Sequence, residues 1–374
     1  MSRAARARID LMALRHNLRR VRQCAPNSRV IAVIKANGYG HGQVQVARAL
    51  TEADTLAVAC IEEALILREA GIGKPILLLE GVFEAAELPL CSRWNLAVAV
   101  HDPGQVEMLE QARLERPLTV WLKIDTGMHR LGIAPEQATA SRQRLRACPA
   151  VATVHLMSHL AKADEREVDF TWRQLRLFGE LCRVLPGERS LANSAAVLAW
   201  PQTHFDWVRP GLMLYGTSPF ADTLADEEGL QPVMTLMTRL ISVRRLQQGE
   251  PVGYGGTWVC PEEMDVGVAA IGYADGYPRH APSGTPVLVN GRRAGLAGRV
   301  SMDMLGIDLR GHPEAKVGDP VVLWGRGLPV EIIAQAAATI PYTLLCGVTS
   351  RVRFQYGSPG DGYPKGDPPV VAKR

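Results

Sequence analysis

The segment 33–42, VIKANGYGHG, combines a lysine with closely spaced glycines. Lys35 ends an apolar run, where lysines are rare because burial of an unpaired charge is costly. Glycines at 38, 40 and 42, around Tyr39 and His41, predict tight turns and close approach of a ligand to the backbone. A desolvated lysine in such a place can act as a nucleophile toward an aldehyde. The residues alone also allow a rim lysine that reaches solvent.

Three further polar segments follow apolar runs. KIDTGMHRLG contains Lys123, Asp125 and Arg130, and an arginine near a strand end suits a carboxylate or a phosphate. MSHLAKAD contains His159, and VRPGLMLYG contains Arg209. The alternative to a role in a site is that Arg130 forms an ion pair at the surface. For His159 the alternative is a hydrogen-bonded residue of the core. These side chains can share a site only if the preceding runs converge on one edge of the fold.

The apolar runs that must position these residues number eight, with helically spaced stretches between them. They are nearly continuous and rich in Val, Leu and Ala, which is typical of parallel strands buried on both faces. Repeated strand–helix alternation favours an N-terminal (β/α)8 barrel of the TIM type over an open doubly wound sheet. The predicted strands are 29–35, 55–60, 75–81, 96–100, 118–125, 151–159, 190–194 and 205–211.

Short apolar runs broken by Gly and Pro follow residue 230 and predict a C-terminal, mostly β domain. The expected fold class is therefore α/β plus β, with the barrel over residues 1–228 and the second domain over 229–374. The linker is expected at 217–229, and the Pro- and Gly-rich tail from residue 357 is expected to be irregular. Near the amino terminus, IDLMALRHNL predicts a strand end that leads into an amphipathic helix.

Composition excludes several classes of protein. The 374 residues include 42 basic and 38 acidic side chains, a balance that predicts neither a nucleic-acid nor a membrane partner. The basic start is not followed by an apolar stretch, so we expect no secretory signal. Seven cysteines without a CxxC pair predict buried free thiols in the cytoplasm, with neither a disulfide framework nor a metal site.

A phosphate site is expected where the seventh and eighth strands end, because barrels of this type often bind phosphate there. Ser194, in NSAA, and Gly211 with the amide of Leu212 fall in those loops. A phosphate site that faces a lysine on strand one favours pyridoxal 5'-phosphate, attached covalently to Lys35 as a Schiff base. A sugar-phosphate enzyme on the same barrel is the competing interpretation at this point.

Eight motifs, in order between about residues 8 and 353, resemble those of alanine racemases. The resemblance implies an isomerase that interconverts L- and D-alanine on pyridoxal phosphate and supplies or consumes D-alanine for peptidoglycan. It also implies a barrel, a C-terminal β domain and a head-to-tail homodimer. The alternatives are a racemase of broader specificity, a decarboxylase on a similar barrel, and a cofactor-binding protein without catalysis. The motifs are VIKANGYGHG, KIDTGMHRLG, SHLAKAD, NSAA, VRPGLMLYG, GYGGTW, IGYADGYPR and GRVSMDM.

The resemblance implies two opposed bases, since racemisation removes a proton from one face and returns it on the other. Lys35 takes the proton from the D enantiomer, and Tyr254 in GYGGTW, from the other subunit, takes it from the L enantiomer. A phenol ordinarily ionises near about pH 10, so Tyr254 needs activation, and His159 and Arg209 resemble residues linked to it by hydrogen bonds. Arg209 also resembles an arginine that faces the pyridine nitrogen. Because a guanidinium keeps its proton, the ring becomes a weaker electron sink and side reactions are limited.

Binding contacts are implied in the same way. Arg130 and the backbone amide of Met302 resemble the pair that holds the substrate carboxylate. Lys123 resembles a lysine that is often carbamylated and then steadies that arginine. Tyr273 and Asp303 fall at positions that line the entrance and the active site. The implied cofactor contacts are Lys35, Tyr39, Ser194, Arg209, Gly211, Leu212 and Ser350.

Ser350, in VTSRVRF, departs from the pattern. Some members of the family have a tyrosine there, which contacts the phosphate and narrows the entrance. A serine hydroxyl can still reach a phosphate, but the entrance is expected to be wider. The departure therefore favours a less strict preference for alanine.

Overall fold

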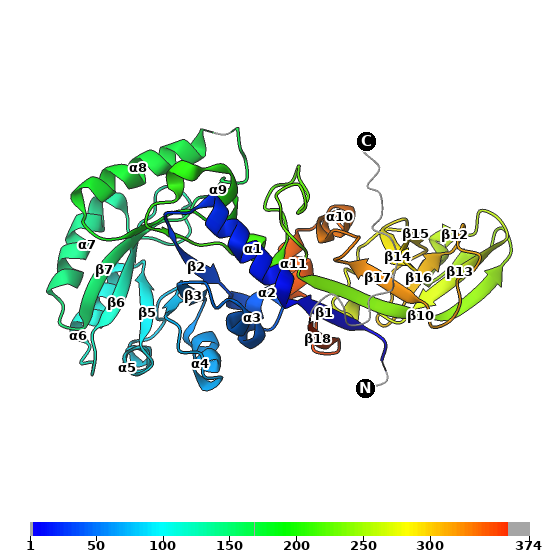
Figure 1. The fold of residues 1–374 in the computed structure, drawn as a ribbon, viewed down its shortest axis with the longest axis horizontal. Helices are drawn as coiled ribbons and strands as arrows, with labels where there is room; N and C mark the ends of the chain where they lie inside the picture. Colours follow the sequence, from blue (N-terminus) through cyan, green and yellow to red (C-terminus); the bar gives the residue numbers. More distant parts are fainter. Residues whose placement is uncertain (1–2, 168, 358–374) are drawn as a thin grey trace.

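The computed structural model describes residues 3–167 and 169–357. Two bodies lie at opposite ends of an elongated molecule, and the long strand β10 (Met234–Leu246) extends from the middle of the molecule through the C-terminal body (Figure 1). The tail for which irregular structure was expected lies, from residue 358 on, outside the described residues. None of the helices in this part of the chain combines the length and the apolar character needed to cross a membrane.

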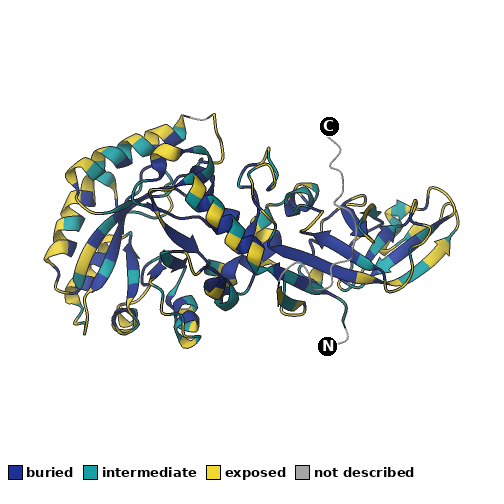
Figure 2. Ribbon diagram, viewed as in Figure 1, coloured by how far each residue is buried: buried dark blue, intermediate teal, exposed yellow. Residues whose placement is uncertain are grey.

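The N-terminal body is the predicted barrel, closed by the pairing of β2 with β9. Every predicted apolar run overlaps one of its eight parallel strands, although the last two strands are short. Strand residues are mostly buried and the helices around them expose their outer faces (Figure 2). The strands are β2 (Arg29–Val33), β3 (Thr55–Val58), β4 (Ile76–Leu78), β5 (Leu96–Val100), β6 (Leu118–Lys123), β7 (Val151–Met157), β8 (Arg189–Ser190) and β9 (Trp207–Val208).

Helix α1 (Leu11–Cys24) begins at Asp10, whose carboxylate accepts hydrogen bonds from the backbone amides of Met12 (2.9 Å) and Ala13 (3.0 Å). Such a cap satisfies amides that lack a partner in the first turn. The predicted strand end and helix are thereby confirmed. The other helices of this part are α2 (Lys35–Tyr39), α3 (Gln43–Ala49), α4 (Ile61–Glu69), α5 (Leu88–Arg93), α6 (Pro103–Gln111), α7 (Pro135–Ala147), α8 (Phe170–Val184) and α9 (Ser194–Ala199), with 3-10 turns η1 (Ala85–Glu87), η2 (Pro201–Thr203) and η3 (Leu212–Tyr215).

The C-terminal body is a mostly antiparallel sheet with the strand order β13-β16-β15-β14-β17-β10-β1-β18. Strand β10 also pairs with β13, so six of these strands form a closed ring. The predicted β domain is confirmed. Its remaining elements are β11 (Pro251–Val252), η4 (Tyr254–Gly256), β12 (Trp258–Val259), β13 (Met264–Ala269), η5 (Tyr273–Asp275), β14 (Pro286–Val289), β15 (Arg292–Leu296), β16 (Leu305–Asp308), β17 (Pro320–Trp324), α10 (Val330–Ala336), α11 (Pro341–Cys346) and β18 (Arg353–Gly357).

Strand β1 (Arg6–Asp10) does not follow the expected boundary at residue 228. It precedes the barrel in the chain, yet it pairs antiparallel with β10 and parallel with β18. Ala7 and Ile9 are buried while their neighbours are partly exposed, the alternation of a strand with one buried face. The assignment of residues 1–228 to the barrel is therefore wrong for this strand, because a single sequence does not show which strand will pair with it.

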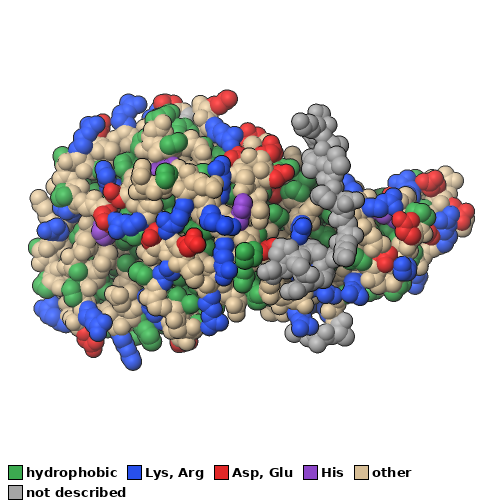
Figure 3. Space-filling view, in the orientation of Figure 1, with side chains coloured by type: hydrophobic (Ala, Val, Ile, Leu, Met, Phe, Trp, Pro, Cys, Tyr) green, Lys and Arg blue, Asp and Glu red, His purple; other side chains and the backbone are tan. Residues whose placement is uncertain are grey.

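Charged side chains of both signs are mixed over the face of the molecule shown in Figure 3. This distribution agrees with the near balance of 42 basic and 38 acidic residues. Positively charged side chains cluster instead inside the barrel mouth, where several of them, carried by different strands and loops, lie close enough to interact.

Candidate active site

The carboxyl ends of the barrel strands open into a cavity of about 1940 Å3. Its wall includes polar residues that follow β2, β6, β7, β8 and β9, as expected for a barrel of this type. The structure thus brings together a large part of the predicted site from segments far apart in the chain. The predicted residues in the wall are Lys35, Tyr39, Lys123, Arg130, His159, Ser194, Arg209, Gly211 and Leu212.

The backbone directly after Lys35 forms a left-handed turn. Ala36, Asn37 and Tyr39 have φ of 51°, 53° and 51°, and Gly38 and the residue after Tyr39 are also positive. A non-glycine residue in this conformation costs about 1–2 kcal/mol, so the surroundings must hold the turn in place. The tight turn predicted from the glycines is confirmed.

Helix α11 packs against this turn from the other end of the chain. A Cβ on Gly40 would lie only 2.1 Å from the carbonyl oxygen of Leu345, so no other residue fits there without displacing the backbone. Tyr342 and Cys346 of the same helix line the cavity, and the ring centroid of Tyr342 lies 5.9 Å from that of Tyr39. No sequence pattern indicated these two residues, because α11 lies far from Lys35 in the chain.

Tyr39 and Ser194 meet at the predicted phosphate loops. The Tyr39 ring is buried and stacks on Tyr215, with 4.6 Å between the ring centroids. Its hydroxyl lies against Gly211, where a Cβ would be 2.4 Å from the oxygen. The Ser194 hydroxyl accepts hydrogen bonds from the amides of Gly211 (2.9 Å) and Met213 (3.3 Å). The hydroxyl groups of Tyr39 and Ser194 therefore both lie next to the backbone of Gly211, which has no side chain. This arrangement fits a phosphate group.

Arg209 is buried beneath the same loops. Its guanidinium donates to the Ser190 hydroxyl at 2.6 Å and to the carbonyl oxygens of Ser158 and Leu191. Burial lowers the pKa of Arg209 to about 10, which still leaves it protonated at neutral pH. The side chain is thus a fixed cation held by three acceptors.

The other cations of the cavity change each other's ionisation. Burial, and then Arg209, Arg130 and Lys35, lower the pKa of Lys123 to about 8, and Glu80 opposes the shift. Burial and the same cations hold the pKa of His159 well below its usual range, so its imidazole is neutral at physiological pH. A cavity lined in this way favours an anionic ligand.

The cysteines are free, as predicted, but not all are buried. Cys91, Cys148 and Cys260 are buried and Cys346 is exposed, while the other three are partly buried. The expectation of buried thiols is therefore wrong for Cys346, since α11 presents it to the open cavity. In the part of the chain that the structure describes, no three His, Cys, Asp or Glu residues lie close enough to hold a metal ion.

Predicted site residues from the second domain do not line this cavity. Tyr254, in the turn η4, is 68% exposed, Tyr273 is 38% exposed and Met302 is 52% exposed. The turns that carry the last two pack together, because the amide of Tyr273 donates to Ser301 (3.1 Å). These side chains therefore form a separate, outward-facing group.

Asp303 and Ser350 belong to the same outer group. The Asp303 carboxylate forms ion pairs with Arg351 and with Arg3. The distance between Asp303 and the Arg3 guanidinium is 3.4 Å. Arg3 also lies 2.5 Å from Asp275, which is fully buried. Ser350 is exposed beside Arg351 and does not line the cavity, so its contact with a cofactor stays a prediction.

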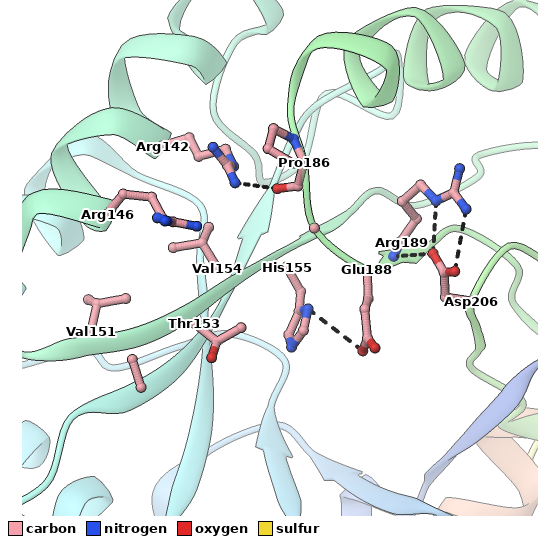
Figure 4. A pocket seen from close by; sticks show the side chains of 12 residues that line it. Arg142, Arg146, Val151, Thr153, Val154, His155, Pro186, Glu188, Arg189 and Asp206 are labelled. Atoms are coloured by element: carbon pink, nitrogen blue, oxygen red, sulfur yellow. Dashed lines mark hydrogen bonds and ion pairs between the residues drawn. The ribbon is translucent and has the colours of Figure 1, made fainter.

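A second pocket, of about 600 Å3, lies at the amino ends of β7, β8 and β9 (Figure 4). Its acidic side chains have basic partners: Asp206 accepts from Arg189 at 2.8 Å, and Glu188 lies 3.7 Å from the His155 ring. Arg142 donates to the carbonyl of Pro186 and so connects α7 to the loop between α8 and β8. None of the predicted site residues lies here, and this end of a barrel usually serves stability.

Comparison with known proteins agrees with this geometry. Models of the alanine racemase N-terminal and C-terminal domains match residues 9–219 and 233–356. The alanine racemase of Nitrosococcus oceani is 58% identical over 92% of this chain and 97% of that protein. Biosynthetic alanine racemase from Pseudomonas aeruginosa has a TM-score of 0.92 at 51% identity, over 95% of this chain and 99% of that one. Alanine racemase from Bartonella henselae with covalently bound pyridoxal phosphate has a TM-score of 0.86 at 28% identity, over 94% and 99%. The chain belongs to the alanine racemase family.

Proposed function

We propose that this chain interconverts L-alanine and D-alanine with pyridoxal phosphate attached to Lys35. The observation that carries the proposal is the position of Lys35, at the end of the first barrel strand and in one cavity with Arg209, Ser194 and Gly211. Covalent attachment is supported by the Bartonella henselae relative, which is described with covalently bound cofactor.

The residues of the cavity fit this cofactor. The hydroxyls of Tyr39 and Ser194 and the backbone of Gly211 and Leu212 would hold the phosphate, and Arg209 would donate to the pyridine nitrogen. Pyridoxal phosphate, when bound, draws electron density from the α-carbon of the amino acid joined to it. Because Arg209 stays protonated near neutral pH, it supplies a hydrogen bond rather than a full proton, and we expect this to restrain side reactions.

Two bases on opposite faces would move the proton. With cofactor and substrate bound, the amine of Lys35 would accept or return a proton on one face. Tyr254 would act on the other face, with His159 and Arg209 as its hydrogen-bonded neighbours. Within one chain Tyr254 does not line the cavity, which supports a role for it in the cavity of a second copy.

We propose that two chains form a head-to-tail homodimer in which each second domain completes the neighbour's cavity. Support comes from the large, exposed side chains that carry predicted roles, Tyr254, Tyr273 and Met302. Large apolar side chains that face solvent together commonly mark an interface. Tyr273 and Asp303 would then line the entrance to the partner's site.

Substrate binding is proposed for Arg130, which is exposed at the cavity, and for the amide of Met302 of the partner subunit. A guanidinium and an amide suit a carboxylate. Lys123, with a pKa of about 8, has a reactive neutral fraction near neutral pH, which supports a carbamate on this amine. Such a carbamate would replace repulsion from Arg130 by attraction.

The biological role that we propose is supply of D-alanine for peptidoglycan in the cytoplasm. Support comes from relatives described as biosynthetic alanine racemases. A racemase of broader specificity is the second candidate, favoured by Ser350 in place of an entrance-narrowing tyrosine.

The test combines chemistry and mass spectrometry. Purified protein is incubated with L-alanine in deuterated water, and optical rotation and α-deuteration are followed. Borohydride reduction and digestion should then place the cofactor on Lys35. Lys35→Ala is expected to lose about 10⁴-fold or more in activity and Tyr254→Phe about 10²–10⁴-fold, as expected for loss of an acid–base group. Full activity in either variant would refute the two-base assignment.

A further inference from the structure

Glu63 lies in the first turn of α4, directly behind the turn that follows Lys35. One carboxylate oxygen accepts a hydrogen bond from the amide of Ala36 at 2.7 Å. The other oxygen accepts from the amide of Ala59 at 2.9 Å. A single half-buried carboxylate therefore joins the residue after Lys35 to the loop that follows β3.

The two hydrogen bonds of Glu63 lie just beyond the end of the backbone hydrogen bonding between β2 and β3. Strands β2 and β3 pair in parallel, and the last backbone bond between them joins the amide of Ile34 to the carbonyl of Ala57 at 2.8 Å. Beyond that point the backbones diverge and Glu63 supplies the acceptors. Lys35 therefore lies between two hydrogen-bonded amides. The amide of Ile34 bonds to strand β3, and the amide of Ala36 bonds to the Glu63 carboxylate.

A second contact reinforces the arrangement. The side-chain amide of Gln43 donates to the backbone carbonyl of Glu63 at 3.2 Å. The backbone amide of Gln43 donates to the side chain of Asn37 at 3.0 Å. Asn37 is one of the residues with positive φ, so the start of the left-handed turn is connected to Glu63 directly at Ala36 and through Gln43 at Asn37.

We propose that Glu63 is a positioning residue. It fixes the backbone of Lys35, so that the Lys35 amine keeps a constant position in the cavity. The inference rests on the proposed function, in which Lys35 carries the cofactor and moves the proton. Glu63 does not line the cavity and therefore acts through Ala36 rather than on substrate. The turn it holds is strained at its non-glycine residues, and such turns persist only where neighbours determine them.

Three variants test the proposal. Glu63→Ala removes both acceptors, Glu63→Gln keeps one carbonyl oxygen, and Glu62→Gln removes a neighbouring charge whose side chain is exposed. We expect kcat of Glu63→Ala to fall about 10- to 100-fold, since a small misplacement of a reacting group has this effect. KM for alanine is expected to stay within about twofold, because the substrate contacts are untouched. Glu63→Gln is expected to lie between parent and Glu63→Ala, and Glu62→Gln to match the parent.

Hydrogen exchange provides a readout independent of turnover. In the full-length protein, the amides of Ala36 and Ala59 are expected to lose protection in Glu63→Ala while those of β6 stay protected. Retention of pyridoxal phosphate on dialysis, followed by absorbance, is expected to fall in parallel. Unchanged kcat together with unchanged exchange would overturn the proposal. If Glu63→Ala does not fold, Glu63→Gln decides the question by the same measurements.

The proposed function and this inference fail in different ways. A parent protein without racemisation would refute the function. An active parent whose Glu63 variants keep parental kcat and parental exchange at Ala36 would refute only the role of Glu63. A fall in kcat without loss of protection at Ala36 would also refute it, because Glu63 would then act by another route.

Discussion

The barrel mouth and the outer face of the second domain both carry predicted site residues, but they are built differently. At the mouth, Arg209 is buried and bound by three acceptors. On the outer face, Tyr254 is 68% exposed and Met302 is 52% exposed. The mouth forms a cavity within one chain, whereas the predicted residues of the outer face do not line that cavity. The difference supports the proposed division of the site between two chains, with its buried half in the barrel.

The largest predicted contrast is between Arg209→Leu and Tyr254→Phe. Loss of the guanidinium leaves the Ser158 and Leu191 carbonyls and the Ser190 hydroxyl without their donor, at a cost of about 1–3 kcal/mol in the free energy of unfolding. Tyr254→Phe removes an exposed hydroxyl and is expected to leave that free energy unchanged. Both variants should lose racemase activity. Urea unfolding and activity measured together check this, and equal destabilisation by the two changes would contradict the division into a buried and an exposed half.

The next largest effect is expected at Lys123 and concerns the pH dependence of the free energy of unfolding. Its pKa is about 8 in the folded protein against 10.5 for a free lysine, so the folded state binds fewer protons between these values. Stability then rises with pH across this window, since the unfolded state holds the proton longer. Replacing Lys123 by Met should add up to about 3 kcal/mol to the free energy of unfolding near pH 7 and little above about pH 10.

Lys316 on the second domain is the matched control. It is exposed, so Lys316→Met is expected to leave the free energy of unfolding close to that of the parent. Unfolding is measured in buffer free of carbon dioxide and again with isotopically labelled bicarbonate, where a carbamate on Lys123 should stabilise the parent. A Lys123 variant with the parental pH profile in both buffers would show that the barrel mouth does not perturb this lysine.

Ser350→Tyr is expected to have the smallest effect. The position is exposed and outside the cavity wall of one chain, so a tyrosine should leave the fold unchanged. If Ser350 lies at the entrance, as the resemblance implies, the tyrosine should narrow it. The ratio of kcat/KM for alanine over serine is expected to rise by about 10-fold at most, the lower end of the discrimination that one extra group in a pocket produces. A ratio that stays the same or falls would remove Ser350 from the account of specificity.

Much of the barrel could be predicted because most residues of its strands are buried, so that each strand reads as an apolar run. Lys35 stood out for the same reason, as a charge that ends such a run. The contacts of Gly40 with α11 and of β1 with β10 could not be predicted. They join segments distant in the chain, and no local pattern encodes their pairing.

Glu63 illustrates the same limit within the site. An acidic residue in the first turn of a helix is common, since it interacts well with the amino end of the helix dipole. Only the structure reveals that its two oxygens reach Ala36 and Ala59. Residues that act on reacting atoms have recognisable types, whereas residues that position them are identified by their hydrogen bonds.

The most direct test of the divided site is complementation between two inactive variants. Lys35→Ala and Tyr254→Phe are mixed in equal amounts under conditions that allow the chains to exchange. In a twofold dimer, half of the dimers are then mixed and each has one site with both parental residues. The account predicts recovery of about a quarter of the parental activity per chain. No recovery, with mixed dimers demonstrated by mass spectrometry, would contradict the claim that Tyr254 serves the neighbouring chain.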